Sequence, residues 1–119
     1  MPQSFDAIFV SSGAVRILAH AGEGQLGVPV LVTSSGHVKP KARRHDGIYE
    51  FHLKGSALHG RSAAIAALVT DVNEHTNRTS LTVKIHNGKK VVYTKTLSED
   101  AAHDRADVGY GFFFDFFAG

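Results

Sequence analysis

The sequence predicts an all-β domain built as an antiparallel β-sandwich, of the jelly-roll-like or immunoglobulin-like kind. The apolar runs are short, and Gly, which occurs 12 times, separates them, whereas Pro occurs only three times. In "GIYEFHLKG" the residues alternate, so that Tyr49, Phe51 and Leu53 share one face of a strand. With 119 residues the chain is expected to form a single β-sandwich domain over 1–119.

Three further apolar runs precede that segment, and each is expected to be a strand. They are "FDAIFV" (5–10), "AVRILAHA" (14–21) and "VPVLVT" (28–33). The turn before the third run, "GEGQLG", matches G-x-G-x-x-G at Gly22, Gly24 and Gly27. A dinucleotide site needs a helix after this motif, whereas Pro29 and β-branched residues follow here. We therefore expect a glycine-rich turn without a nucleotide cofactor.

The segment 62–75 allows two interpretations. Apolar residues recur at helical spacing from Ile65 to Val72, with Ser62 in the N-cap position. As a strand, the same segment has small or apolar residues on both faces, which is typical of a central strand covered on both sides. We favour a strand because the rest of the chain is β-rich. A helix over 62–75 would change the fold class to α+β.

The segment "SLTVKIHNGKKVVYTKTL" predicts a β-hairpin, because Asn-Gly joins two β-rich runs. A two-residue loop would pair Ile85 with Lys90. A three-residue loop with a bulge would pair Ile85 with Val91 and Val83 with Tyr93, which brings apolar residues together. We favour the bulged register.

The ending "GYGFFFDFFAG" predicts a strand that is apolar on both faces. Tyr110 and alternate Phe residues after it lie on one face, which is expected to fill the core. Phe113, Asp115 and Phe117 lie on the other face. That face is either covered within the same chain or buried at an interface between subunits, and an apolar ligand or a membrane surface is the third alternative.

Composition excludes several classes of protein. Cys is absent, so the chain has no disulfide, no zinc-thiolate site and no thiol nucleophile. No signal-peptide pattern or apolar run of membrane-spanning length occurs, so we expect a cytoplasmic protein, or one exported without a classical signal peptide, and no membrane span. The formal net charge is only +2. Because no aromatic residue interleaves the one basic stretch, "HVKPKARRHDG", we expect no nucleic-acid partner.

Three polar loops are the candidate binding sites. One is this basic stretch, and the others are "DVNEHTN" and "SEDAAHDRADVG", whose carboxylates, amides and imidazoles suit calcium or a transition metal. For each loop a solvated polar turn is the favoured interpretation, so no cofactor is expected, with calcium as the ion to test. The predicted ligand-binding residues are His37, Arg43, Arg44, Asp46, Asn73, His75, Asn77, Arg78, Asp100, His103, Asp104 and Asp107.

The function predicted from these features is non-catalytic, because no nucleophile elbow is found. Paired acids for glycoside cleavage stay an open alternative, but Glu is sparse and none lies in an apolar setting that would clearly raise its pKa. The first hypothesis is a lectin-like module that binds a glycan, or another anionic or polar ligand, through its loops and gains avidity as a homo-oligomer. The second is a structural or assembly subunit, such as a self-associating scaffold or capsid-like component. The third is a small metal-dependent enzyme or metal carrier that uses the His and Asp loops.

Overall fold

The computed structural model describes residues 1–43 and 47–119, with the backbone alone described for Ala42 and Arg43. Ten strands and one short helix make up this part of the chain. They are β1 (Gln3–Val10), β2 (Ala14–Ala21), β3 (Leu26–Thr33), β4 (Gly36–Val38), β5 (Ala42–Arg43), β6 (Ile48–Lys54), α1 (Gly55–Leu58), β7 (Ser62–Thr70), β8 (Arg78–Asn87), β9 (Lys90–Asp100) and β10 (Asp107–Ala118). The all-β prediction is confirmed.

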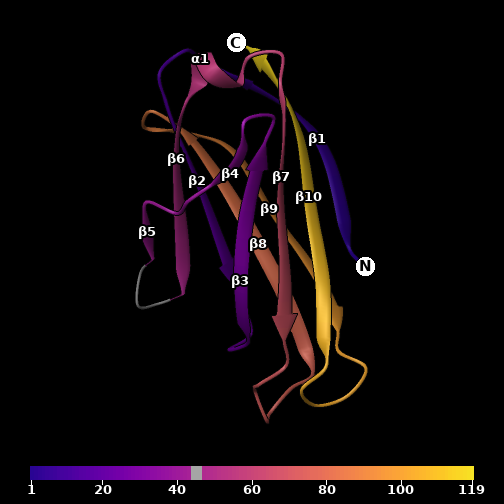
Figure 1. Cartoon of the computed structure of the whole chain (residues 1–119). Coiled ribbons are helices and arrows are strands. Elements are labelled where there is room, and N and C mark those ends of the chain that lie inside the picture. The colour runs from indigo at the N-terminus through magenta and orange to yellow at the C-terminus, as the bar shows by residue number, and fades with distance from the viewer. Residues whose placement is uncertain (44–46) are drawn as a thin grey trace.

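The strands form two packed sheets, which run one in front of the other in Figure 1. Sheet A has the order β1-β10-β7-β3-β4, and sheet B has the order β5-β6-β2-β8-β9. All the pairings are antiparallel except that of β1 with β10, which is parallel and joins Gln3 to Gly111. The sandwich is therefore antiparallel-rich, with its last strand inside sheet A.

The inner face of β10 forms the centre of the core, as the ending of the sequence predicts. Tyr110, Phe112, Phe114 and Phe116 are each at most 1% exposed. The Tyr110 hydroxyl lies 2.6 Å from the Thr79 hydroxyl of sheet B, so the one polar atom on this face has a partner. Aromatic residues from a single strand thus supply much of the apolar contact between the sheets.

The segment 62–70 is a strand, and the α+β alternative is wrong. β7 pairs with β10 on one side and with β3 on the other. Its inward residues, among them Ile65 and Val69, are buried, whereas Leu68 on the opposite face is 62% exposed. Hydrogen bonding to two neighbours satisfies the backbone along the strand, and the small Ala side chains allow close packing. Tertiary context therefore overrides the helical spacing.

The hairpin forms with a bulge, but the predicted register is wrong. Asn87 pairs with Lys90 around a two-residue turn that contains Gly88, whose φ is +64°. The bulge follows Ile85, which pairs with Tyr93 instead of Val91, and Val83 pairs with Lys95 instead of Tyr93. This register lets Tyr93 pack edge-on against Phe114, with ring centroids 5.2 Å apart. The packing of Tyr93 against Phe114 of sheet A therefore stabilises this register more than the pairing of Ile85 with Val91 would stabilise the predicted one.

A polar cluster links the two edge strands β1 and β9. The Tyr93 hydroxyl donates a hydrogen bond to Asp6 Oδ2 at 2.8 Å, and Lys95 Nζ lies 3.7 Å from the same oxygen. The hydrogen bond from the Ser4 hydroxyl, with smaller contributions from Tyr93 and Lys95, holds the pKa of Asp6 below 3.8, against the opposing effect of burial. Burial raises the pKa of Tyr93 to about 12.

We expect Asp6→Asn to lower the free energy of unfolding by about 1–2 kcal/mol at neutral pH, since it weakens several hydrogen bonds to a charged group. The folded pKa of Asp6 is depressed, so its contribution is present above the unfolded pKa and is lost as the pH falls through the folded pKa. The difference between wild type and variant should therefore shrink below about pH 4. Urea unfolding at several pH values measures this, with Asp100→Asn as a control for the lost charge. A difference that does not change with pH would contradict the prediction.

Candidate functional site

Two of the three predicted loops come together at one end of the sandwich, which we call the loop end and define as residues 71–77 and 101–106 (Figure 1). The amide of Asp71 donates to the carbonyl of Ala106, and the amide of Arg105 donates to the carbonyl of Asp71, each at 3.0 Å. The amide of Ala101 donates to the carbonyl of Asn77 at 2.7 Å. Backbone hydrogen bonds therefore fix the two loops against each other.

The side chain of Gln25 organises the first of these loops. Gln25 Oε1 accepts hydrogen bonds from the amides of Val72 and Asn73 at 2.7 and 2.8 Å. Its Nε2 donates to the carbonyls of Thr76 and Arg78 at 3.1 and 3.0 Å. One buried amide thus satisfies four backbone groups of the loop. Sequence reasoning missed Gln25, which stands in the glycine-rich turn, because nothing in its neighbourhood indicates a distant partner.

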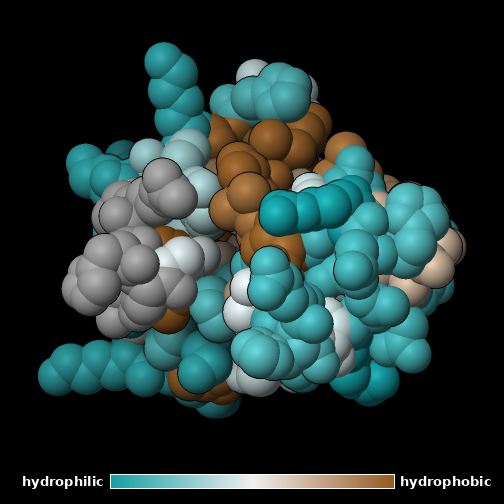
Figure 2. All heavy atoms as spheres, turned by 90° about the horizontal axis from the view of Figure 1, so that it is seen from below, coloured by the Kyte–Doolittle hydropathy of each residue, from teal (hydrophilic) through white to brown (hydrophobic). Residues whose placement is uncertain are grey.

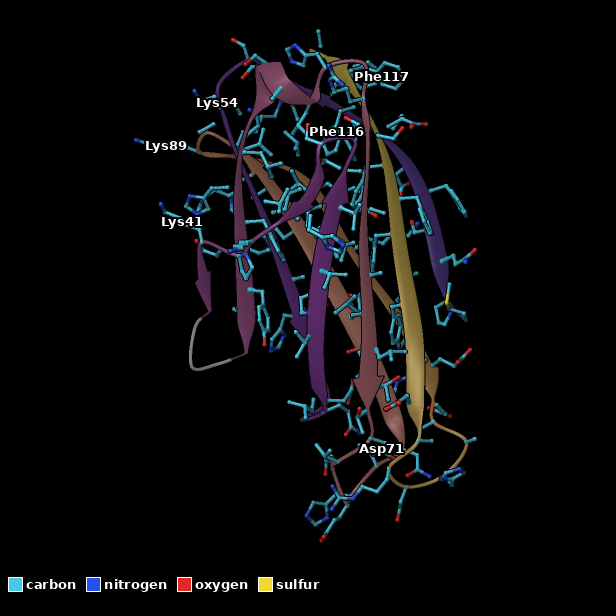
Figure 3. The ribbon with its side chains drawn as sticks, viewed as in Figure 1. Lys41, Lys54, Asp71, Lys89, Phe116 and Phe117 are labelled. Carbon is cyan, nitrogen blue, oxygen red and sulfur yellow. The ribbon has the colours of Figure 1, made fainter. Side chains whose placement is uncertain are left out.

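A cluster of three side chains, Asp71, Asn77 and Asp104, lies where the loops meet. Figure 3 shows Asp71 at the lower end of β7, between the two loops. In the orientation that satisfies both carboxylates, Asn77 Nδ2 donates to Asp71 Oδ2 at 2.7 Å and to Asp104 Oδ1 at 2.8 Å. Asp71 is only 2% exposed. Its Oδ1 atom is buried and has no hydrogen-bond partner among the described residues.

Most of the other predicted residues at this end make local structural contacts. Arg78 lies 3.7 Å from Asp100, and Asp107 accepts a hydrogen bond from the Thr70 hydroxyl at 2.6 Å. Asn73 donates to the carbonyl of Glu23 at 2.8 Å. The side chains of His75 and His103 are partly or fully exposed to solvent at the rim of the loops. Arg78, Asp100, Asp107 and Asn73 are thus engaged in contacts within the fold.

The basic loop does not join this group in the part of the chain that is described. His37 lies on the short edge strand β4, and the backbone of Arg43 lies on β5. In Figure 1, β4 lies above the loop end and β5 lies to its left, away from the two loops. Arg44 and Asp46, also predicted as ligand-binding residues, lie outside the described residues. Within residues 1–43 and 47–119, no group of three or more His, Asp and Glu side chains is placed to hold a metal ion.

The second candidate is the solvent-facing surface of sheet A, which we call the outer face. Its exposed apolar residues are Phe5, Phe9, Leu26, Val28, Val30, Leu68 and Phe117. Figure 2, which looks along the strands from the loop end, shows the main group of hydrophobic side chains in its upper middle, with hydrophilic side chains beside it. The idea that one chain covers both faces of its last strand is therefore wrong, since Phe117 is 44% exposed. An apolar surface spread over four neighbouring strands is typical of an interaction surface.

The outer face has a ridge beside two hollows. Phe5 stacks on Phe113 with ring centroids 4.9 Å apart, and Phe9 packs on Phe117 at 5.5 Å, so that β1 and β10 carry the ridge. Hollows of about 790 and 560 Å³ flank Phe113, which lines both. Beside the ridge, the larger hollow is lined by the small Ala63 and Ala64 of β7. The smaller hollow is lined by Ala66 and also by larger apolar residues, including Leu26, Val28 and Leu68. At the level of the larger hollow, the rings on β1 and β10 thus lie beside small side chains on β7.

A pair of opposite charges borders the same hollow. Asp115 accepts a hydrogen bond from the Ser62 hydroxyl at 2.6 Å, and Arg61 donates to the Ser34 hydroxyl at 3.2 Å. Both Asp115 and Arg61 line the larger hollow, and among the described residues neither has an ion-pair partner. The outer face therefore carries the acidic Asp115 on β10 and the basic Arg61 immediately before β7. The two groups are at neighbouring positions, because Asp115 pairs with Ser62.

No protein-family model matches the chain, and neither a curated protein nor a solved structure matches it. Among the described residues, no helix has both the length and the apolar character to cross a membrane. The arrangement of the residues themselves is thus the basis for a proposal about function.

Proposed function

We propose that the chain is a non-catalytic, self-associating subunit in which the outer face of sheet A packs on the same face of a second copy. The observation that carries this proposal is the exposed apolar surface, on which Phe5 is 72% and Leu68 is 62% exposed. Burial of apolar area is favourable by about 25 cal/mol per Å². The free energy of an apolar face of this composition is therefore lower when a protein partner covers it than when water does.

The size of the face is adequate for a specific contact. Four strands about 4.8 Å apart, each about eight residues long at about 3.4 Å per residue, present roughly 500 Å² in projection. Because the side chains protrude from the sheet, the accessible area of the face is larger than its projected area. It approaches the roughly 800 Å² per partner that a standard interface buries. Sheet-on-sheet packing at about 10 Å is the same arrangement that closes the core of this sandwich.

A second copy is the occupant that the face fits best, because the ridge on β1 and β10 complements the larger hollow over β7. A two-fold axis parallel to the strands, between β10 and β7, would place the ridge of one copy over β7 and β3 of the other. Phe5 and Phe113 would then fill the hollow over Ala64 of the partner copy, and the reverse contact would be equivalent. The same axis brings Asp115 of each copy to Arg61 of the other.

The test uses the charge pair, measured as the dimer dissociation constant by sedimentation equilibrium. Asp115→Arg and Arg61→Asp should each weaken dimerisation at least tenfold, because each brings like charges together. The double variant should restore most of the affinity. Phe113→Ser/Phe117→Ser should yield a folded monomer, whereas Val91→Ser, which removes a 47% exposed apolar residue from sheet B, should leave dimerisation unchanged. A monomeric wild type at millimolar concentration would refute the proposal.

Glycan binding at the loop end is the second candidate function. The observation that favours it is that Gln25 shapes the first polar loop and the cluster joins that loop to the second, with His75, His103 and Asp104 exposed there. The two-fold axis described above would place the loop ends of both copies at the same end of the dimer, which gives avidity to weak single sites. A screen of immobilised glycans, with and without calcium, tests it. Absence of binding to every glycan would refute this second function and leave the assembly proposal intact.

A further inference from the structure

We propose that the loop end holds a divalent cation, with calcium as the ion its donors suit, bound by Asp71, Asn77 and Asp104. The first observation is the buried carboxylate. Asp71 is 2% exposed, and its Oδ1 atom has no hydrogen-bond partner among the described residues. An ionised oxygen that is removed from water without a partner is costly, so such atoms are rare in folded proteins.

The second observation is the uncompensated charge. Asp71 and Asp104 both lie within hydrogen-bond distance of one atom of the Asn77 amide, at 2.7 and 2.8 Å. Among the described residues, neither carboxylate forms an ion pair with a basic side chain. A neutral amide between two carboxylates satisfies hydrogen bonds but leaves two negative charges close together. A bound cation would neutralise them.

The geometry of the cluster fits an oxygen-ligated ion. If the Asn77 amide turns over, its oxygen faces Asp71 Oδ2 and Asp104 Oδ1, and three hard oxygen donors from two loops converge. Bidentate binding by the Asp71 carboxylate would also give its unpartnered Oδ1 atom a partner. Oxygens bound to one calcium ion at about 2.4 Å lie about 2.8–3.4 Å from one another, close to the spacing in this cluster. Calcium accepts six to eight oxygens in irregular geometry, and waters or backbone carbonyls complete its shell in many proteins.

Space for that shell lies beside the cluster. A hollow of about 100 Å³ is lined by Asp71, Asp104 and Glu74 and by Val72, Asn73 and Arg105. Waters, and the Glu74 carboxylate after a change of rotamer, can therefore reach the ion. The three proposed ligands are all oxygen donors, which favours calcium over the transition metals. Loops without strict octahedral geometry favour calcium over magnesium.

The cation would lock the two loops together. Asp71 and Asn77 belong to the loop that Gln25 organises, whereas Asp104 belongs to the loop that precedes β10. A site with two carboxylates is expected to bind weakly, with a dissociation constant of roughly 10⁻⁴–10⁻³ M. Calcium at a concentration ten times that dissociation constant should raise the midpoint of thermal unfolding by several degrees.

Titration of the metal-free chain with calcium chloride tests the proposal, by calorimetry and by thermal unfolding. Wild type should show saturable binding with one ion per chain, stronger than with magnesium chloride. Asp104→Asn should weaken calcium binding at least tenfold, and the exposed position of Asp104 makes a folded variant expected. Asp100→Asn removes one carboxylate from the neighbouring strand end, outside the cluster, and should bind calcium like wild type.

The NMR signals of the Asn77 side-chain amide give a second readout. Without calcium its NH₂ protons should be hydrogen-bonded to the carboxylates, and with calcium they should turn away and exchange faster with water. A calcium concentration of about 10 mM is about ten times the weakest expected dissociation constant. Absence of binding up to that concentration would overturn the proposal. Equal binding by wild type and Asp104→Asn would overturn it as well, since calcium would then bind elsewhere.

Discussion

Replacing Phe112 by Ala is expected to lower the free energy of unfolding by about 3–5 kcal/mol, the largest effect of any single change considered for this chain. Phe112 is fully buried and pairs across the sheet with Ile65, which is also fully buried. Its ring packs at a centroid distance of 6.4 Å from that of Phe114. Strands pack on both sides of the site, so it cannot collapse around the cavity, and the loss approaches the upper end of the range.

Urea unfolding followed by circular dichroism measures this change, at a protein concentration low enough for monomers. A loss of that size is a large part of the roughly 5–15 kcal/mol that stabilises a domain of this size. Phe9→Ala is the matched control, since Phe9 is 62% exposed and should cost under about 1 kcal/mol. Equal losses in the two variants would show that the inner face of β10 is not the centre of the core.

Replacing Gln25 by Ala is expected to cost about 2–4 kcal/mol, because four backbone groups lose their partner at once. The amides of Val72 and Asn73 lose their acceptor, and the carbonyls of Thr76 and Arg78 lose their donor. Water can reach part of the loop, which keeps the loss below four full desolvation penalties. Urea unfolding gives the free energy. Hydrogen exchange should show faster exchange at 72 and 73 than elsewhere in the chain.

Two variants isolate the role of Gln25. Gln25→Glu keeps the acceptor but replaces the donor with a charged oxygen that faces two carbonyls, so it should be at least as unstable as Gln25→Ala. Gln3→Ala removes the same side chain from an exposed position of β1 and should change stability by no more than about 0.5 kcal/mol. A stable Gln25→Ala with slow exchange at 72 and 73 would mean that the backbone bonds between the loops suffice.

The sequence predicts the fold class because its local signals agree. Alternation in 48–54 and the apolar inner positions of 110–116 are each explained by a strand, and all these residues lie in strands. The segment 62–70 carries two conflicting periodicities, and only the presence of neighbours on both sides decides between them. Hairpin register fails for a similar reason. Its decisive contact, between Tyr93 and Phe114, joins residues of different sheets.

The loop end is only partly predictable. Asp71, Asn77 and Asp104 lie in stretches whose polar composition attracts notice, but their proximity depends on β7 and β10 being neighbours. Gln25 carries no local signal at all, because its four partners lie some fifty positions away. The sequence indicates the part of the outer face that Phe113, Asp115 and Phe117 of β10 form. The contributions of β1 and β3 required the order of strands in the sheet.

The position of β10 between β1 and β7 has a consequence for the time course of folding. β1 is the first strand in the chain, yet within sheet A its hydrogen-bonding partner is the last. During synthesis the residues of β1 must remain unpaired in that sheet while everything up to β10 is made, whereas the β8–β9 hairpin can close at once. Pairings over such distances make folding slow, on the order of milliseconds to seconds. Ile8 and Val10 of β1, which are buried in the folded chain, are exposed throughout that interval. A chaperone that shields β1 should therefore raise the yield of folded chain.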